Sequence, residues 1–247
     1  MKTITSLQNE SIKQAVKLQD ALWRKIHGQF VAQGYSTCMT LIKSGFQPVA
    51  LYLTHPFYLR HADEFDIDSI IIVTNEIINK ISTVSASTGI VAVFAIPKRT
   101  YTPTSNALVL YNIQDPGNMG TLIRSAAAMN IKNIFTIGGC DIYNPKVIQA
   151  TVGTIANVTV IATDWEAFSQ EHAHITTCAL VVENGKKPEE ANLAESILVI
   201  GNEGQGLPEN IVEACSQKMT IPMPGKTESL NAAVAGSIAL YLKANQI

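Results

Sequence analysis

At 247 residues, the chain is long enough to bury a sizeable core, as one large domain or as two small ones. Apolar residues make up 47% of it and charged residues 15%, which excludes an intrinsically disordered protein, and no apolar run is long enough to cross a membrane. The net charge of −2 counts against a protein covered in nucleic acid, but residues 1–45 carry six lysines and arginines against two acids, a local +4 that fits either RNA contact or a solvated helix.

The first residues, 1–6, contain no apolar core followed by a cleavage site. We therefore expect no signal peptide and a cytoplasmic protein. Four cysteines lie far apart without a C-x-x-C pair, which favours reduced thiols over a disulfide framework or a metal site.

The N-terminal part predicts both helices and strands. Residues 9–25 place Ile12, Val16 and the apolar residues of 18–22 on one side and lysines opposite, which is the period of an amphipathic helix. A second helix is expected over 35–44. Strands are expected over three apolar runs, 49–53, 70–73 and 89–96. The stretch 97–106 has two prolines and no periodicity, so it predicts a linker.

Beyond residue 106, strands and helices alternate. The expected strands are 107–111, 133–137, 158–161, 177–182, 197–200 and 219–221. The expected helices are 119–129, 144–151, 164–172, 208–215 and 230–243. Continuous apolar strands separated by helices indicate a mainly parallel sheet covered on both faces. Ligands of such sheets bind beyond the carboxyl ends of the strands, which directs attention to the loops that follow Tyr111, Ile200 and Ile221.

The tripeptide Gly225-Lys-Thr227 is typical of the end of a phosphate-binding loop, but the rest of that motif is missing. A phosphate-binding loop needs a glycine five positions before Gly225, where Thr220 stands. The phosphates are held by backbone N–H groups, and Pro222 and Pro224 have none. Neither of the other glycine-rich loops reads G-x-G-x-x-G, so a dinucleotide site is not indicated either.

Three loops, 112–120, 200–208 and 221–231, combine glycines and prolines that fix a tight backbone. On these loops, or just after them, stand polar side chains of the kind that a functional site needs, namely Asn118, Arg124, Glu203, Ser229 and Asn231. One such loop is most simply a turn. Three at one end of one sheet favour a site.

The spacing on the helix at 119–129 separates Arg124 from the core. Leu122, Ala126 and Met129 form an apolar stripe, whereas Arg124 lies on another stripe with its helical neighbours. We expect Arg124 to point away from its own core, toward a site, a partner subunit or a surface ion pair.

Three segments, in order, resemble the motifs of a known family. They are NIQDPGNMGTLIRSAAAMN at 112–130, LVIGNEGQGLPENI at 198–211 and IPMPGKTESLNAAVAGSIALY at 221–241. They resemble the SpoU/TrmH family of the SPOUT superfamily, which are S-adenosylmethionine (AdoMet)-dependent RNA 2′-O-ribose methyltransferases. The resemblance covers 107–243. More loosely, KLQDALWRKIHGQFVAQG at 17–34 resembles that family's small RNA-substrate-binding domain.

The resemblance implies an α/β fold whose C-terminal SPOUT domain, 107–247, contains a deep trefoil knot. A small α/β RNA-substrate-binding domain, 1–97, precedes it, with 98–106 as the linker. It further implies a homodimer, and the chemistry of the family needs no metal ion. The strand-sized apolar runs predict no membrane association. Ribosomal RNA is the first expected substrate and transfer RNA the second.

Carried over by the same resemblance, one set of residues binds AdoMet: Gly201, Ile221, Leu230, Ile200 and Met223. Arg124 becomes the central catalytic residue, with Asn118, Glu203, Ser229 and Asn231 orienting ribose and arginine. Since arginine stays protonated and is a poor base, our hypothesis is that Arg124 positions the ribose hydroxyl and lowers the pKa of that hydroxyl. Two alternatives stay open: a non-catalytic RNA-binding protein that kept the fold, and a SPOUT enzyme that methylates a base nitrogen.

Overall fold

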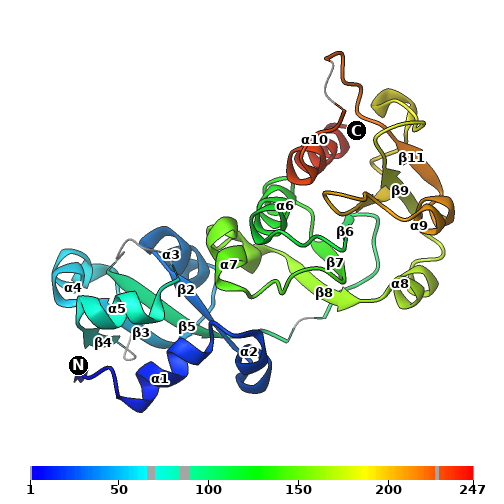
Figure 1. The fold of residues 1–247 in the computed structure, drawn as a ribbon. Helices are drawn as coiled ribbons and strands as arrows, with labels where there is room; N and C mark the ends of the chain where they lie inside the picture. Colours follow the sequence, from blue (N-terminus) through cyan, green and yellow to red (C-terminus); the bar gives the residue numbers. More distant parts are fainter. Residues whose placement is uncertain (1, 66–69, 84–88, 99, 226–227, 247) are drawn as a thin grey trace. The chain divides into compact units, whose positions relative to one another are not determined.

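The computed structural model describes residues 2–65, 70–83, 89–98, 100–225 and 228–246 (Figure 1). The chain forms two compact units. The N-terminal unit comprises residues 1–98 together with 141–156, and the C-terminal unit comprises 99–140 and 157–247. The segment 141–156 therefore packs with the N-terminal unit, although both of its ends continue into the C-terminal unit. No helix within the described ranges is long and apolar enough to cross a membrane.

The N-terminal unit is a five-stranded mixed sheet with helices on both faces, in the strand order β1-β4-β3-β5-β2. Its strands are β1 (Lys2–Ile4), β2 (Gln29–Gln33), β3 (Pro48–Thr54), β4 (Ile70–Val73) and β5 (Ile90–Ala95). Its helices are α1 (Glu10–Lys17), α2 (Ala21–His27), α3 (Tyr35–Lys43), α4 (His55–His61), α5 (Asn75–Ile81) and α7 (Pro145–Thr151), with a 3-10 turn at Ala62–Glu64. β1, β4 and β3 are parallel, and β5 is antiparallel to β3 and β2.

The expected helix over 9–25 is wrong in one respect, because the structure breaks it into α1 and α2. The break falls at residues 18–20, where the Asp20 carboxylate accepts a hydrogen bond from the Leu22 backbone N–H and caps α2. The new helix axis turns Leu22, which was expected on the apolar side, outward to 61% exposure, while Ile12 and Leu18 are buried as expected.

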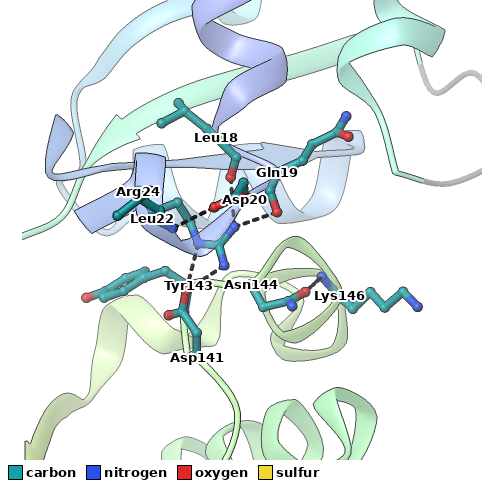
Figure 2. A network of polar contacts seen from close by, with 9 residues as sticks. All are labelled: Leu18, Gln19, Asp20, Leu22, Arg24, Asp141, Tyr143, Asn144 and Lys146. Atoms are coloured by element: carbon teal, nitrogen blue, oxygen red, sulfur yellow. Dashed lines mark hydrogen bonds and ion pairs between the residues drawn. The ribbon is translucent and has the colours of Figure 1, made fainter. Parts of the chain in front are cut away.

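Arg24 is buried in the N-terminal unit, with 2% of its surface exposed (Figure 2). Its Nη1 donates to the carbonyls of Leu18 and Gln19, each at 2.8 Å, and so fixes the α1–α2 break. Its Nε and Nη2 contact Asp141 Oδ2 at 2.7 and 2.6 Å. One of the six cations that make residues 1–45 basic is therefore withdrawn from the surface and cannot contact RNA.

The C-terminal unit is built on a six-stranded sheet in the order β11-β9-β10-β6-β7-β8, and each of its strand pairs is parallel, which confirms the expected parallel sheet. The strands are β6 (Ala107–Tyr111), β7 (Asn133–Ile137), β8 (Thr159–Thr163), β9 (Thr176–Leu180), β10 (Ser196–Ile200) and β11 (Gln217–Met219). The helices are α6 (Pro116–Ala128), α8 (Trp165–Glu171), α9 (Glu209–Ala214) and α10 (Ala232–Asn245), with a 3-10 turn at Pro188–Glu190. A further 3-10 turn, Thr154–Asn157, spans the point where the chain passes from the N-terminal to the C-terminal unit.

The chain passes very close to itself near β11. A Cβ on Gly185 would lie 2.5 Å from the Met219 carbonyl carbon, and the Lys186 backbone N–H donates to the Lys218 carbonyl at 2.9 Å. Only glycine can stand at such a crossing. The trefoil knot expected for this part of the chain stays a prediction.

α10 packs on α6 through small residues (Figure 1). A Cβ on Gly236 would lie 2.4 Å from a methyl group of Leu122 and 2.7 Å from one of Ile200. The Ser125 and Ser237 hydroxyls meet at 2.7 Å across the same contact. The small residues of α10 thus serve packing within one chain, and they leave Val234 and Tyr241 on the outer side of the helix, 48% and 57% exposed.

The C-terminal end of α10 is anchored by a buried lysine. The Lys243 side chain is 5% exposed, and its Nζ donates to the carbonyls of Leu193, Ala194 and Ser196 at 2.7, 3.1 and 2.8 Å. Burial lowers the pKa of Lys243 to about 8, against an ordinary value of 10.5.

This shift gives Lys243 a pH-dependent effect on stability. Between about pH 8 and 10.5 the folded chain has released the Lys243 proton while the unfolded chain still binds it, so rising pH favours folding through this group. We expect the unfolding free energy of the wild type, minus that of Lys243→Met, to increase from pH 7 to pH 9.5 in urea titrations. The subtraction removes the contribution of other titrating groups, and a difference that stays flat would contradict the prediction.

Candidate active site

The three loops expected to form a site do converge in the C-terminal unit, at the carboxyl ends of its strands. Asn118 in the first turn of α6 connects them. Its Nδ2 donates to Glu203 Oε1 at 2.8 Å, and its Oδ1 accepts from Asn231 Nδ2 at 3.1 Å. Three of the five expected catalytic residues therefore form one hydrogen-bonded network, drawn from three separate loops.

Local capping explains why these side chains are held in place. Asp115 caps α6 by accepting the Asn118 N–H at 2.8 Å, with Pro116 at the first helical position. Asn231 caps α10, because its Oδ1 accepts from the backbone N–H groups of Ala233 and Val234 at 2.9 and 3.2 Å. The two asparagines that meet in the network therefore stand at the starts of the two helices that pack together.

Asn202, which was not among the expected site residues, joins two of the loops. Its Nδ2 donates to the Asn112 carbonyl at 2.9 Å and so ties the second loop to the first. Its Oδ1 accepts from the Gly204 N–H at 2.8 Å in a local turn. An asparagine two residues before a glycine is a signal for such a turn, but the sequence does not reveal the partner 90 residues away.

Beside this network lies a cavity of about 250 Å³, close to the lower limit of roughly 300 Å³ typical of small-molecule sites. All five residues expected to bind AdoMet line it, and Glu203 and Ser229 lie on its wall. The lining residues are Leu180, Val181, Val182, Ile200, Gly201, Asn202, Glu203, Gly204, Gln205, Gly206, Ile221, Met223, Ser229, Leu230, Ala232 and Ala235.

The wall formed by 180–182, at the end of β9, was not expected. These residues are apolar and carry no catalytic chemistry, so only the fold reveals their place. Another part of the wall, 201–206, is folded tightly on itself, since a Cβ on Gly201 would lie 2.4 Å from the Gly206 carbonyl carbon. Apolar side chains together with main-chain N–H and C=O groups make a surface suited to a heterocyclic ring.

Arg124 lies apart from the network. It is six residues after Asn118 on α6, about 9 Å farther along the axis and roughly 120° around it. It is exposed together with Thr121 and Ala128, which confirms that its stripe faces away from the core. Its guanidinium makes no hydrogen bond or ion pair with the part of the chain that the structure describes.

Two other features of the sequence concern phosphate and metal binding. Lys226 and Thr227, of the tripeptide that suggests a phosphate loop, lie outside the described residues. Within the described ranges, no group of three or more His, Cys, Asp or Glu side chains could hold a metal ion.

Comparison with protein families matches residues 105–241 to the SpoU rRNA Methylase family and residues 9–92 to the MRM3-like substrate binding domain. Among curated proteins, the chain is 25% identical to the 23S rRNA (guanosine(2553)-2′-O)-methyltransferase RlmP of Bacillus subtilis, over 98% of both chains.

Among solved structures, an RNA 2′-O ribose methyltransferase matches with a TM-score of 0.82 and 25% identity, over 99% of this chain and 98% of that one. The AdoMet complex of AviRb from Streptomyces viridochromogenes has a TM-score of 0.84 at 22% identity, over 97% and 98%, and shows that the fold is shared. The family match covers more than half of the chain and contains all three loops of the site. The chain belongs to the SpoU rRNA methylase family of RNA methyltransferases.

Proposed function

We propose that this chain is an AdoMet-dependent methyltransferase that modifies a ribose 2′-hydroxyl of ribosomal RNA in the cytoplasm. The observation that carries the proposal is the Asn118–Glu203–Asn231 network beside a cavity with apolar and main-chain walls. RlmP, a relative matched over 98% of its length, is a 2′-O-methyltransferase of 23S rRNA, which favours ribosomal over transfer RNA.

The cavity residues fit AdoMet by their chemistry. Ile200, Ile221, Met223 and Leu230 offer apolar surface to an adenine ring, while the backbone at Gly201 offers hydrogen-bonding groups that no side chain obstructs. When bound, AdoMet supplies a methyl group on a positively charged sulfur. The protein must then bring a ribose oxygen into line with that methyl group and exclude water.

Asn118, Glu203 and Asn231 are suited to holding the ribose, since their mutual hydrogen bonds fix the direction of each amide and of the carboxylate. Ser229 on the cavity wall adds a hydroxyl that both donates and accepts. Arg124 would contribute a fixed positive charge that lowers the pKa of the ribose hydroxyl and stabilises negative charge developing on its oxygen.

The exposed position of Arg124 fits a homodimer in which the subunit interface completes the site. The outer side of α10 presents Val234 and Tyr241, and α10 packs beside the helix that carries Arg124. We expect Tyr241→Asp to shift the protein from dimer to monomer in analytical ultracentrifugation and to lower methyl transfer at least about tenfold. A wild-type protein that sediments as a monomer at micromolar concentration would contradict this part of the proposal.

Within this proposal, residues 1–97 bind the RNA substrate, 98–106 link the domains and 107–247 carry out methyl transfer. The test is methyl transfer from labelled AdoMet to total RNA from cells that lack the gene, followed by separation of RNA classes and alkaline hydrolysis. Label in an alkali-resistant dinucleotide from ribosomal RNA supports the proposal. Label in a single nucleotide indicates base methylation, and label in transfer RNA corrects the substrate. Measurable AdoMet binding without any transfer, alongside an active control enzyme, favours the non-catalytic reading.

The cavity wall offers a sharper test of AdoMet binding. In Gly201→Ala the new methyl group would collide with backbone atoms of Gly206 and Leu207, at 2.4 and 2.5 Å, so the wall must move. We expect the AdoMet affinity measured by calorimetry to fall at least about tenfold. The matched variant Gly204→Ala changes the same loop, but its methyl group would meet only Asn202 Oδ1 at 3.6 Å, so a much smaller change is expected. Equal effects of the two variants would contradict this account of the wall.

A further inference from the structure

A second cavity, of about 610 Å³, lies in the N-terminal unit. Its eight lining residues are Thr54, Pro56, Phe57, Arg60, His61, Asn75, Asn79 and Gly89. It opens at the carboxyl ends of the parallel neighbours β3 and β4, where α4 and α5 begin, capped by the hydroxyls of Thr54 and Thr74. None of the residues of the candidate active site contributes to it.

The two helices that flank this cavity diverge to opposite faces of the sheet (Figure 1). α5 packs with α1 through Ile77, Ile78 and Ile81. α4 lies instead beside α3, where the rings of Phe57 and His61 contact Tyr35 at centroid distances of 6.2 and 4.9 Å. Where the helices of adjacent parallel strands part in this way, the sheet leaves a crevice at its carboxyl edge, and ligands commonly bind there.

Close packing between Gly89 and Phe57 fixes part of the cavity wall. Gly89, at a φ of +72°, sits so near the Phe57 ring that a Cβ would lie 2.8 Å from it, and the Gly89 carbonyl accepts the Thr54 N–H at 2.9 Å. Any side chain at this position would enter the space that Phe57 fills. The start of β5 is thereby held against α4, which fixes one side of the crevice.

The residues that line the cavity suit a ligand that carries a negative charge and also has groups that form hydrogen bonds. Arg60 is a cation, and no carboxylate lies among the eight lining residues. The nearby Glu64 is already engaged, since it accepts hydrogen bonds from Tyr35 and from His61, the latter at 2.7 Å. The Arg60 Nε bonds only its own helix, at the Pro56 carbonyl, 3.3 Å away, and its Nη groups have no partner within the described ranges.

Asn75 and Asn79 complete this chemistry. They are one turn apart on α5, so their amides lie on the same side of the helix, and both side chains are exposed. Asparagine amides pair with the hydrogen-bonding edges of bases, and arginine pairs with phosphate through its planar fork. A base and a phosphate together make a nucleotide.

We propose that this cavity holds one unpaired nucleotide of the substrate RNA, with Arg60 on its phosphate and Asn75 and Asn79 on its base edge. This inference rests on the proposed function for the identity of the RNA. It gives the N-terminal unit a defined contact, in place of a generally basic surface.

The test compares full-length wild type with Arg60→Gln/Asn79→Ala for binding to a fluorescent 23S rRNA transcript, measured by anisotropy. We expect the affinity to fall at least about tenfold, since both an arginine–phosphate and an amide–base contact are lost. In Arg60→Gln alone, the slope of log K against log salt should decrease in magnitude by about 0.7, the value for one phosphate contact on a single strand. Lys80→Ala is the control, because it removes an exposed cation from α5, next to Asn79, at a position that does not line the cavity.

An RNA affinity unchanged by the double variant, or reduced equally by Lys80→Ala, overturns the inference. So does a wild type that binds no RNA, and so does competition in which free nucleoside monophosphates displace RNA as effectively as unlabelled RNA does. Methyl transfer is measured separately on the same proteins. RNA binding that depends on Arg60, without any methyl transfer, would support this nucleotide site and reject the methyltransferase proposal. Methyl transfer that is unchanged in the Arg60 and Asn79 variants would support the methyltransferase proposal and reject this site.

Discussion

Arg124→Lys is expected to lower kcat for methyl transfer to RNA at least about 100-fold while leaving AdoMet affinity within about twofold. Lysine keeps the charge but lacks the planar guanidinium, which presents donors in a fixed fork to two acceptors at once. If Arg124 holds the ribose oxygen and a neighbouring phosphate together, a compact ammonium cannot do both. Single-turnover measurements with labelled AdoMet separate this effect from product release.

Arg124 is exposed within its own chain, so the exchange to lysine disturbs no buried contact inside that chain. Lys132→Arg, the reverse exchange at an exposed position four residues beyond the end of α6, should leave transfer unchanged. Near-normal methylation by Arg124→Lys would reject the assigned role and leave a simple charge effect as the explanation.

A large loss of stability is expected at Arg24. Arg24→Met should lower the unfolding free energy by about 3–5 kcal/mol, because it removes one partner of a buried ion pair and leaves two carbonyls, of Leu18 and Gln19, without their donor. Asp141→Asn should cost less, since the Asp141 side chain is 34% exposed and water can replace part of the lost contact.

Urea titrations at fixed pH measure both effects. Lys25→Met, at the exposed neighbour of Arg24, is the control and should lie within about 0.5 kcal/mol of the wild type. If Arg24→Met and Lys25→Met prove equally stable, the network in Figure 2 does not hold the unit together.

Much of the fold follows from the sequence because its strands are continuous apolar runs. Every strand and helix expected after residue 106 is present, since parallel strands buried on both faces leave little ambiguity of period. Fewer elements of the N-terminal unit could be predicted. β1, β2, α4 and α5 were not expected, because elements of three to seven residues are too short to show a period. The break at Asp20 was not expected. Asp20 caps α2 and Arg24 bonds the Leu18 carbonyl, both locally, but the counterion that holds Arg24 in place, Asp141, is distant in sequence.

The candidate site, like the fold, could be predicted only in part from the sequence. The loops rich in glycine, proline and asparagine could be recognised in the sequence, and they meet beside one cavity. Two features could not be read from the sequence. The apolar residues 180–182 have no chemical signature, and the bond between Asn202 and the Asn112 carbonyl joins positions that are neighbours only in space. The roles of individual residues in binding and catalysis remain predictions that the variants above test.

The segment 141–156 bears on how such a protein can be divided or recombined. In sequence the N-terminal unit stops at residue 98, but in space it also includes α7, and the chain changes units at 98–99, 140–141 and 156–157. A truncation at residue 98 would deprive β2 of the helix that packs on it and Arg24 of its counterion, and it would leave the buried side chains of α7 without their cover. The N-terminal unit therefore cannot be added or exchanged by gene fusion at a single junction. Grafting it onto another methyltransferase would require moving α7 and Asp141 with it.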